Sequence, residues 1–234
     1  MGLSHSPKIV TDGLVLCLDA ANKRSYPGTG TVWTDLVGGN SGTLTNGPTF
    51  SSDNGGSIVA DGTNDYILAN STSLNSSFPS TSVSHFIWVY PIGGGQIVVE
   101  LGQTAINTGW HDSNIEISSA GAFSFSTWHG SLTNKVVSSN QSFNTWYHVG
   151  FTYGGTTLTA YINGISIGTT SFTRSAPYNS GYQTHYALFA ISATHMGTFG
   201  YGQGKAGNFM VYNRALTADE VRQNYNTTRG RFGL

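Results

Sequence analysis

Residues 146–168 read Trp-Tyr-His-Val-Gly-Phe-Thr-Tyr-Gly-Gly-Thr-Thr-Leu-Thr-Ala-Tyr-Ile-Asn-Gly-Ile-Ser-Ile-Gly, and this stretch decides the fold. Two runs of aromatic and β-branched residues, 147–153 and 158–162, flank a turn at Gly154-Gly155. Asn163-Gly164 is the strongest two-residue hairpin signal, because both residues accept the positive φ of a type I′ turn. A third strand starts at Ile165. The stretch therefore predicts an antiparallel three-stranded meander.

Turn signals of Gly, Asn, Asp and Pro recur about every ten residues along the rest of the chain, with short β-rich runs between them. This spacing is typical of an all-β sandwich. Residues 83–90 are apolar on both faces, which predicts a strand in the middle of a sheet. Further strands are predicted at residues 14–18, 57–60, 66–68, 96–101, 114–118, 123–128, 186–191 and 207–212.

One helix is predicted, from Ala218 to about Asn226. Thr217 and Glu220 have the spacing of a capping box, and Leu216 and Val221 that of a hydrophobic staple. The expected organisation is an N-terminal arm at residues 1–11, one domain at residues 12–226, and an extended C-terminal tail at residues 227–234.

Only 9% of the 234 residues are charged, and the net charge is −1. Gly, Ser, Thr and Asn together make close to half of the chain, while 12% of residues are aromatic. This composition predicts a folded protein with a neutral polar surface, because disorder normally accompanies few aromatics and high net charge. Nucleic-acid binding and attachment to a membrane are not expected, since both need clustered basic residues. We expect neither a signal peptide nor a transmembrane segment, and we expect Cys17 to be a buried thiol.

Six segments, in order along the chain, resemble the laminin-G-like, concanavalin A-like jelly-roll family. They are residues 13–20, 61–67, 86–91, 146–149, 161–164 and 211–220. This resemblance implies an antiparallel β-sandwich jelly roll with one short C-terminal helix.

Two further segments, residues 25–30 and 229–234, resemble versions of this domain carried by tailed bacteriophages, especially marine ones. This resemblance implies a protein of the virion surface, such as a capsid decoration, head fibre or tail-associated module. The partners it implies are surface glycans, other virion proteins and further copies of the same chain. A virion protein that only contacts its neighbours is the alternative.

An enzyme on the same fold is the third possibility. Glycan hydrolases of this family carry paired carboxylates on one strand, and a retaining mechanism needs such a pair about 5 Å apart. Neither Glu100 nor Glu116 has a second carboxylate at that spacing in the sequence. We therefore expect no catalytic residues and a protein that is not an enzyme.

Two segments have the composition of a sugar-binding site, in which aromatic rings lie beside amides and carboxylates. The first surrounds a hairpin that we expect from residues 114–118 and 123–128. This hairpin would place Trp110 and Trp128 at the same edge of the sheet, although each is equally compatible with a core position. The second is a Tyr-rich loop that suits a protein contact equally well. The predicted carbohydrate-binding residues are Trp110, His111, Asp112, Asn114, Trp128, His129, Tyr178 and Tyr182.

Calcium is the one cofactor the sequence suggests, because hard oxygen ligands are plentiful and relatives of this fold often bind Ca²⁺ at an edge of the sandwich. Asp61, Asn64 and Asp65 are the candidate ligands. Their spacing is not that of an EF-hand, and the sequence favours a simple turn at Asp61-Gly62 slightly over a calcium site. The seven histidines show no zinc spacing.

Overall fold

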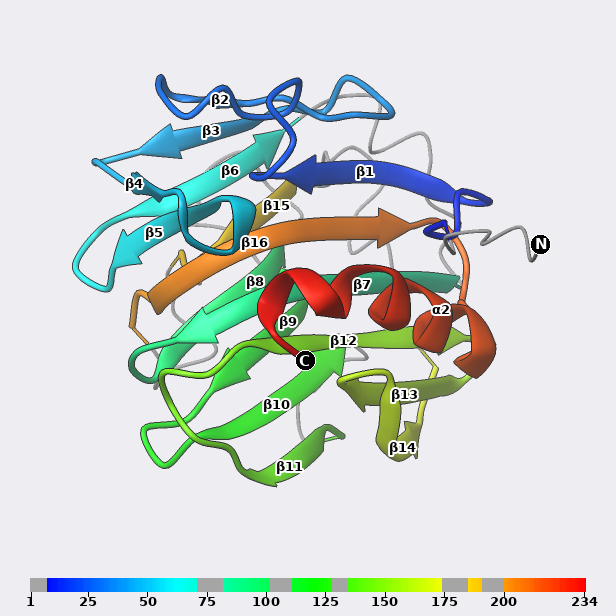
Figure 1. The fold of residues 1–234 in the computed structure, drawn as a ribbon. Helices are drawn as coiled ribbons and strands as arrows, with labels where there is room; N and C mark the ends of the chain where they lie inside the picture. Colours follow the sequence, from blue (N-terminus) through cyan, green and yellow to red (C-terminus); the bar gives the residue numbers. More distant parts are fainter. Residues whose placement is uncertain (1–7, 71–81, 102–110, 128–133, 174–184, 191–199) are drawn as a thin grey trace.

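The computed structural model describes residues 8–70, 82–101, 111–127, 134–173, 185–190 and 200–234. These residues form two antiparallel β-sheets packed face to face, with one α-helix near the C-terminus (Figure 1). The predicted all-β sandwich with a short C-terminal helix is confirmed.

The first sheet, here sheet A, has eight strands. Its order is β14 (Ile165–Ser171), β13 (Thr157–Ile162), β12 (Tyr147–Gly154), β7 (Ser82–Pro91), β16 (Gln203–Tyr212), β5 (Ser57–Asp61) and β4 (Thr49–Ser51), with β1 (Leu14–Asp19) also paired to β16. β7 lies in the middle of this sheet, as its apolar sequence predicts. The predicted meander is β12, β13 and β14, and Asn163 and Gly164 have φ values of 52° and 76°.

The second sheet, sheet B, also has eight strands. Its order is β11 (Val136–Asn140), β10 (Ala122–Thr127), β9 (His111–Ile117), β8 (Gly95–Leu101), β15 (His185–Leu188), β6 (Tyr66–Asn70), β3 (Gly42–Thr45) and β2 (Val32–Trp33). β9 and β10 form the predicted hairpin. The short strands β2, β3, β4 and β11 were not predicted.

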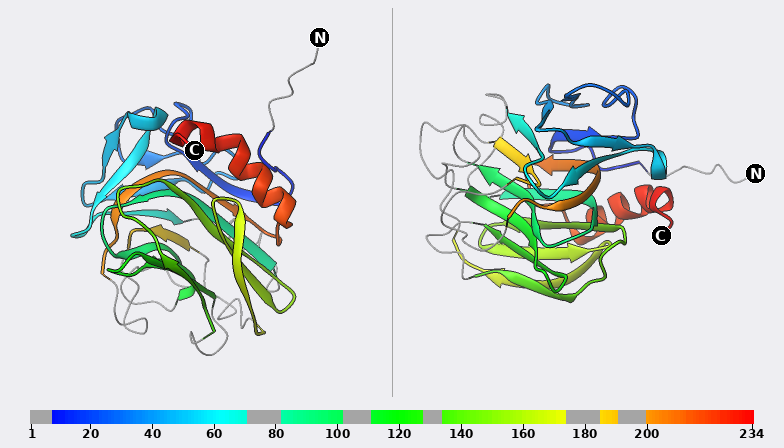
Figure 2. Two further views of the ribbon diagram at one scale, coloured as in Figure 1. Left: turned by 60° about the horizontal axis from the view of Figure 1, so that its bottom comes forward. Right: turned by 90° about the vertical axis from the view of Figure 1, so that its left-hand side faces the viewer.

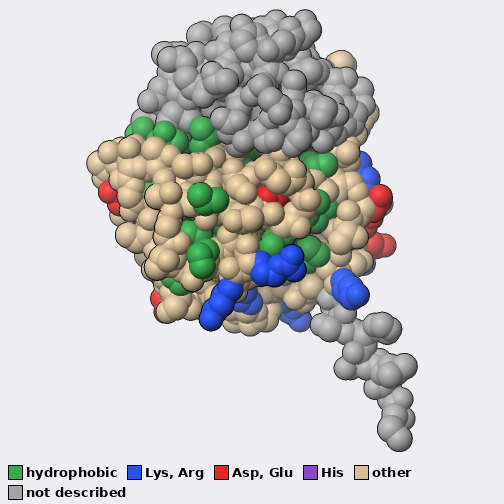
Figure 3. Space-filling view, turned by 90° about the horizontal axis from the view of Figure 1, so that it is seen from above, with side chains coloured by type: hydrophobic (Ala, Val, Ile, Leu, Met, Phe, Trp, Pro, Cys, Tyr) green, Lys and Arg blue, Asp and Glu red, His purple; other side chains and the backbone are tan. Residues whose placement is uncertain are grey.

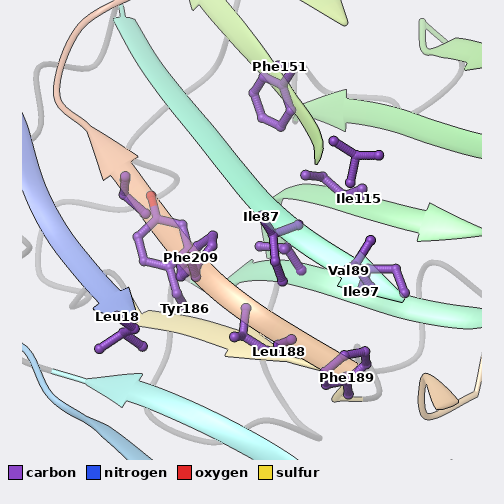
Figure 4. Packing of buried hydrophobic residues seen from close by; sticks show 14 of the residues in the cluster. Leu18, Ile87, Val89, Ile97, Ile115, Phe151, Tyr186, Leu188, Phe189 and Phe209 are labelled. Carbon is purple, nitrogen blue, oxygen red and sulfur yellow. The ribbon is translucent and has the colours of Figure 1, made fainter. Parts of the chain in front are cut away.

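The main core lies between the sheets, where side chains from the inner faces interdigitate (Figure 4). Ile87 and Val89 of β7 and Ile115 of β9 are fully buried in it. Because side chains alternate along a strand, the residues between these positions point to the outer faces of the two sheets. The alternation therefore assigns each functional candidate to the interior or to one outer face.

The outer face of sheet A is covered by α2 (Ala218–Thr228) and the 3₁₀ turn η2 (Arg229–Phe232), which run across β7, β12 and β16 (Figures 1 and 2). The capping box predicted at Thr217 and Glu220 is present, with the Glu220 amide 3.3 Å from Thr217 Oγ1. Val221 packs with Phe86 and Tyr212 beneath the helix. A second 3₁₀ turn, η1 (Asp53–Gly55), precedes β5.

The prediction of an extended tail at residues 227–234 is wrong. Residues 227 and 228 end α2, and η2 continues the helical path to Phe232. The Phe232 ring stacks on Trp88 with the centroids 4.1 Å apart, and it also contacts Trp146. Burial of this ring holds the C-terminal segment against sheet A, and it makes both tryptophans part of the outer apolar layer.

Candidate functional site

The two outer faces of the sandwich differ in chemistry. On sheet A the outer face is aromatic and lies under α2 and η2. On sheet B the outer face carries polar side chains on β8, β9 and β10, beside an apolar group on β6, β8 and β15. The outer face of sheet B is therefore the candidate ligand face.

Glu116 is the centre of the polar group, which we call the Glu116 cluster: Gln96, Asn114, Glu116, Ser126 and Lys135. Glu116 Oε2 accepts hydrogen bonds from Asn114 Nδ2 at 3.1 Å and from Gln96 Nε2 at 3.4 Å. Ser126 donates to Asn114 Oδ1. Lys135 Nζ lies 3.8 Å from Glu116 Oε1. Four of these five side chains are buried, and the Lys135 side chain is 43% exposed.

Burial raises the pKa of Glu116, although Lys135 and the neighbouring hydrogen bonds act in the opposite direction. A carboxyl group with a raised pKa, bonded to two amides, can accept or donate a hydrogen bond. Gln96 Oε1 is buried without a partner among the described residues. The Glu116 cluster thus holds hydrogen-bonding capacity that the described residues leave unused.

The apolar part of the same outer face adjoins the Glu116 cluster through β8. Val99 and Ala187 are buried there, and the partly buried side chains of Tyr66 and Leu68 pack against them. An aromatic ring and aliphatic groups beside amides and a carboxyl group are the combination that sugars need, because a sugar has both C–H faces and hydroxyl edges.

Asn114 is the predicted sugar-binding residue whose side chain the structure places, and it lies within the Glu116 cluster. His111 and Asp112 are the first two residues of β9. Ser113 pairs with Thr127, the last residue of β10. The start of β9 and the end of β10 therefore lie side by side at one end of sheet B. The other candidates, Trp110, Trp128, His129, Tyr178 and Tyr182, lie outside the described residues.

Sequence reasoning missed Gln96, Glu116, Ser126 and Tyr66 as members of this face. The signal for Glu116 was present, because residues 114–117 read Asn-Ile-Glu-Ile and both isoleucines enter the core. Strict alternation places the two polar residues together on the opposite face.

Glu100 belongs to a different group, inside the sandwich. Its Oε2 accepts a hydrogen bond of 2.5 Å from Ser113 Oγ and lies 3.7 Å from His85 Nε2. The Tyr186 hydroxyl lies 2.9 Å from the same His85 nitrogen. Glu100 and Glu116 therefore point to opposite faces of sheet B, and they do not form the carboxylate pair of a retaining glycosidase.

The predicted calcium ligands lie around the turn between β5 and β6. Asp61 Oδ1 accepts the Thr63 N–H at 2.7 Å, and this bond is the main cause of the lowered pKa of Asp61. Asp65 Oδ2 accepts the Asp61 N–H at 3.2 Å, and burial raises the pKa of Asp65. The Asn64 carbonyl accepts from Asn46 Nδ2. These hydrogen bonds stabilise the turn without a metal ion. Calcium binding therefore stays a prediction.

The described residues contain no group of three or more His, Cys, Asp or Glu side chains arranged to hold a metal ion. None of their helices is long and apolar enough to cross a membrane.

Comparison with solved structures finds the same fold in larger proteins. The sialidase of Trypanosoma rangeli in complex with sialic acid superposes with a TM-score of 0.69 at 14% identity, over 95% of this chain and 34% of the sialidase. The botulinum neurotoxin serotype D/C binding domain gives 0.68 at 13% identity, over 92% of this chain and 52% of that domain. The chain thus spans about a third of the sialidase and about half of the toxin domain. A search of curated protein sequences finds no match.

These matches contradict the prediction that the protein is not an enzyme. The solved structures that share its fold include sialidases, both free and bound to an inhibitor. The missing carboxylate motif excludes one hydrolase mechanism only, and it was too narrow a basis for excluding catalysis.

The family comparison agrees with the fold and covers five of the six segments that carry the resemblance in the sequence, all but residues 13–20. The Laminin_G_3 model, described as the concanavalin A-like lectin/glucanases superfamily, matches residues 61–222, more than half of the chain. The matched region contains the Glu116 cluster, Tyr66 and most of both sheets. On this match, the chain belongs to the Laminin_G_3 family of the concanavalin A-like lectin/glucanases superfamily.

Proposed function

We propose that the protein binds carbohydrate on the outer face of sheet B. The observation that carries this proposal is the Glu116 cluster, a buried polar group on three adjacent strands. The partly buried Tyr66 lies on the same outer face, on β6, with β15 between it and β8. Sugar hydroxyls would bond to Asn114, Gln96 and Glu116, while a C–H face packs on the ring.

Two further observations support the proposal: the fold is shared with a carbohydrate-bound protein, and the outer face of sheet A is covered by the C-terminal segment. A related fold occurs in a sialidase that was solved with sialic acid. The outer face of sheet A already has an occupant, because Phe232 and Val221 of the C-terminal segment fill it.

We place this binding activity on the surface of a phage particle, as part of a capsid decoration, head fibre or tail-associated module. The support is the resemblance of residues 25–30 and 229–234 to phage versions of the domain, together with a surface that has few charges. The alternative is a virion protein that contacts only its neighbours and copies of itself. Capsid and tail genes beside this one would support the phage context, and a virion reconstruction would show whether sheet B faces solvent or a neighbour.

A glycan array tests the binding activity with two matched variants. Glu116→Gln removes the carboxyl group on the outer face, and Glu100→Gln makes the same change on the adjacent strand toward the interior. We expect Glu116→Gln to lose about tenfold or more in affinity, since hydrogen bonds to a charged group contribute about 1.5–3 kcal/mol. Glu100→Gln should keep its affinity at temperatures where both variants are folded.

Trp110→Ala and Trp128→Ala extend the test to the edge where β9 begins and β10 ends. Absence of binding to every glycan on the array would refute the function. Full affinity in Glu116→Gln, or an equal loss in both glutamate variants, would refute the site on the outer face of sheet B.

A further inference from the structure

A second groove lies on the opposite side of the molecule from sheet B, where the loop after β1 meets the end of α2. It has a volume of about 610 Å³. Its lining combines amides, hydroxyls and two cations: Asn22, Lys23, Asn226, Thr227, Thr228 and Arg231. Asp19 also lines the groove and forms an ion pair with Arg231.

Two positively charged residues line this groove. The whole chain has ten Lys and Arg residues. Lys23 and Arg231 line the groove, and the exposed residues Arg24 and Arg229 are their neighbours in the sequence. Lys and Arg side chains gather along one border of the face in Figure 3, on an otherwise mainly neutral surface.

Arg231 is fixed in place by the backbone around it. Its Nη1 lies 2.6 Å from Asp19 Oδ1, its Nε donates to the Asn54 carbonyl at 2.6 Å, and its Nη2 donates to the carbonyls of Gly56 and Gly207. The Arg231 charge is thus balanced by Asp19. Arg229 and Arg231 also follow the C-terminal end of α2, where cations are favourable.

Lys23 has no such structural role. It comes from the loop after β1, it is exposed, and among the described residues it forms no ion pair. With Lys23, Arg231 and Asp19 counted together, the groove carries one net positive charge. The Asn226 side chain beside it makes no hydrogen bond within the described part of the chain.

We infer that this groove binds a saccharide that carries one acidic group, a carboxylate or a sulfate, with Lys23 as the partner of the acid and Asn226 and Asn22 as partners of the sugar hydroxyls. A net charge of one matches a single anionic group. The lining suits a sugar, because amides and hydroxyls that can bond to sugar hydroxyls lie beside a comparable area of apolar surface on which a C–H face can pack. The inference extends the proposed carbohydrate binding to a second site, and the two sites can be tested separately.

The test is an NMR titration with methyl β-D-glucuronide and methyl β-D-glucoside, which differ by the carboxylate alone, and with glucose 6-sulfate and inorganic sulfate. We expect the glucuronide and the sulfated sugar to bind at least about threefold more tightly than the glucoside. The shifted amide signals should come from residues 22, 23, 226 and 227. Inorganic sulfate should bind more weakly than glucose 6-sulfate.

Two variants make the result specific. Lys23→Gln should abolish the preference for the acidic sugar. Arg222→Gln should keep it, because Arg222 is another exposed cation, on α2, that pairs with Asp219 at 2.5 Å and lies outside the groove lining. Equal affinity for glucuronide and glucoside, unchanged amide signals at residues 22, 23, 226 and 227, equal losses in both variants, or sulfate binding as tight as the sugar would each overturn the inference. Binding at sheet B is read from the amide signals of β8 to β10, so unchanged signals there would count against the proposed function and not against the groove.

Discussion

Acid should lower the free energy of unfolding through one histidine that lies beneath the C-terminal helix. His148 lies on the outer face of sheet A and is fully buried. Its ring stacks on Phe86 at 5.2 Å and lies 5.2 Å from Trp88 and 6.1 Å from Tyr225 of α2. Both ring nitrogens lack a hydrogen-bond partner among the described residues. The perturbation we choose is His148→Phe, which keeps a flat ring and removes both nitrogens.

The magnitude follows from the pKa of His148, which burial lowers from 6.5 to about 3. The unfolded chain binds this proton below pH 6.5, whereas the folded protein resists it down to about pH 3. Stability is therefore complete above pH 6.5 and is lost progressively as the pH falls toward 3. At about 1.36 kcal/mol per pH unit, the loss is about 2 kcal/mol at pH 5 and about 3 kcal/mol at pH 4.

Urea unfolding of the wild type and His148→Phe at pH 7, 6, 5 and 4 measures this loss. We expect the variant to gain stability relative to the wild type by about 2 kcal/mol between pH 7 and pH 5. A gain is also expected at pH 7, because an unpaired buried polar group costs about 1–3 kcal/mol. A stability difference that stays constant from pH 7 to pH 4 would refute the reasoning, since it would show that His148 titrates alike in both states.

Three further predictions concern other parts of the fold. Phe232→Ala should lower the free energy of unfolding in urea by about 3 kcal/mol or more, because the ring is buried against Trp88; a loss below about 1 kcal/mol would show that η2 is not anchored there. Burial raises the pKa of Cys17 to about 12, so a thiol reagent at pH 8 should label it only after unfolding; rapid labelling of the folded protein would contradict its burial. Calcium should raise the Tm of the wild type and not of Asp61→Asn, and an unchanged Tm in the wild type would leave Asp61 with its turn role alone.

Local sequence was enough to predict the long strands, because runs such as residues 147–153 and 83–90 combine β-propensity with clear ends. It was not enough for β3, which reads Gly-Thr-Leu-Thr, or for β11, which reads Val-Val-Ser-Ser-Asn. Strands of this length depend on pairing with a neighbour, β6 for β3 and β10 for β11, and pairing is not visible in the local pattern.

The C-terminal segment was predicted incorrectly for a related reason. Gly230 and Gly233 favour an end to regular structure, and a single Phe is a weak signal. The stability of η2 comes from the stacking of Phe232 on Trp88, a residue 144 positions earlier in the chain. Only the tertiary structure brings these two rings together.

The candidate site could be predicted in part, because a strand shows which residues share a face but not what covers that face. β7 is apolar on both faces, and both are covered: one by sheet B and the other by α2. β9 is apolar on one face only, with Asn114 and Glu116 on the other. Buried polar groups cost free energy unless they are hydrogen-bonded. The carboxyl group and amides on the outer face of sheet B therefore add little to the stability of the fold. The contrast between these two strands therefore points to a binding role for the outer face of sheet B and a structural role for that of sheet A.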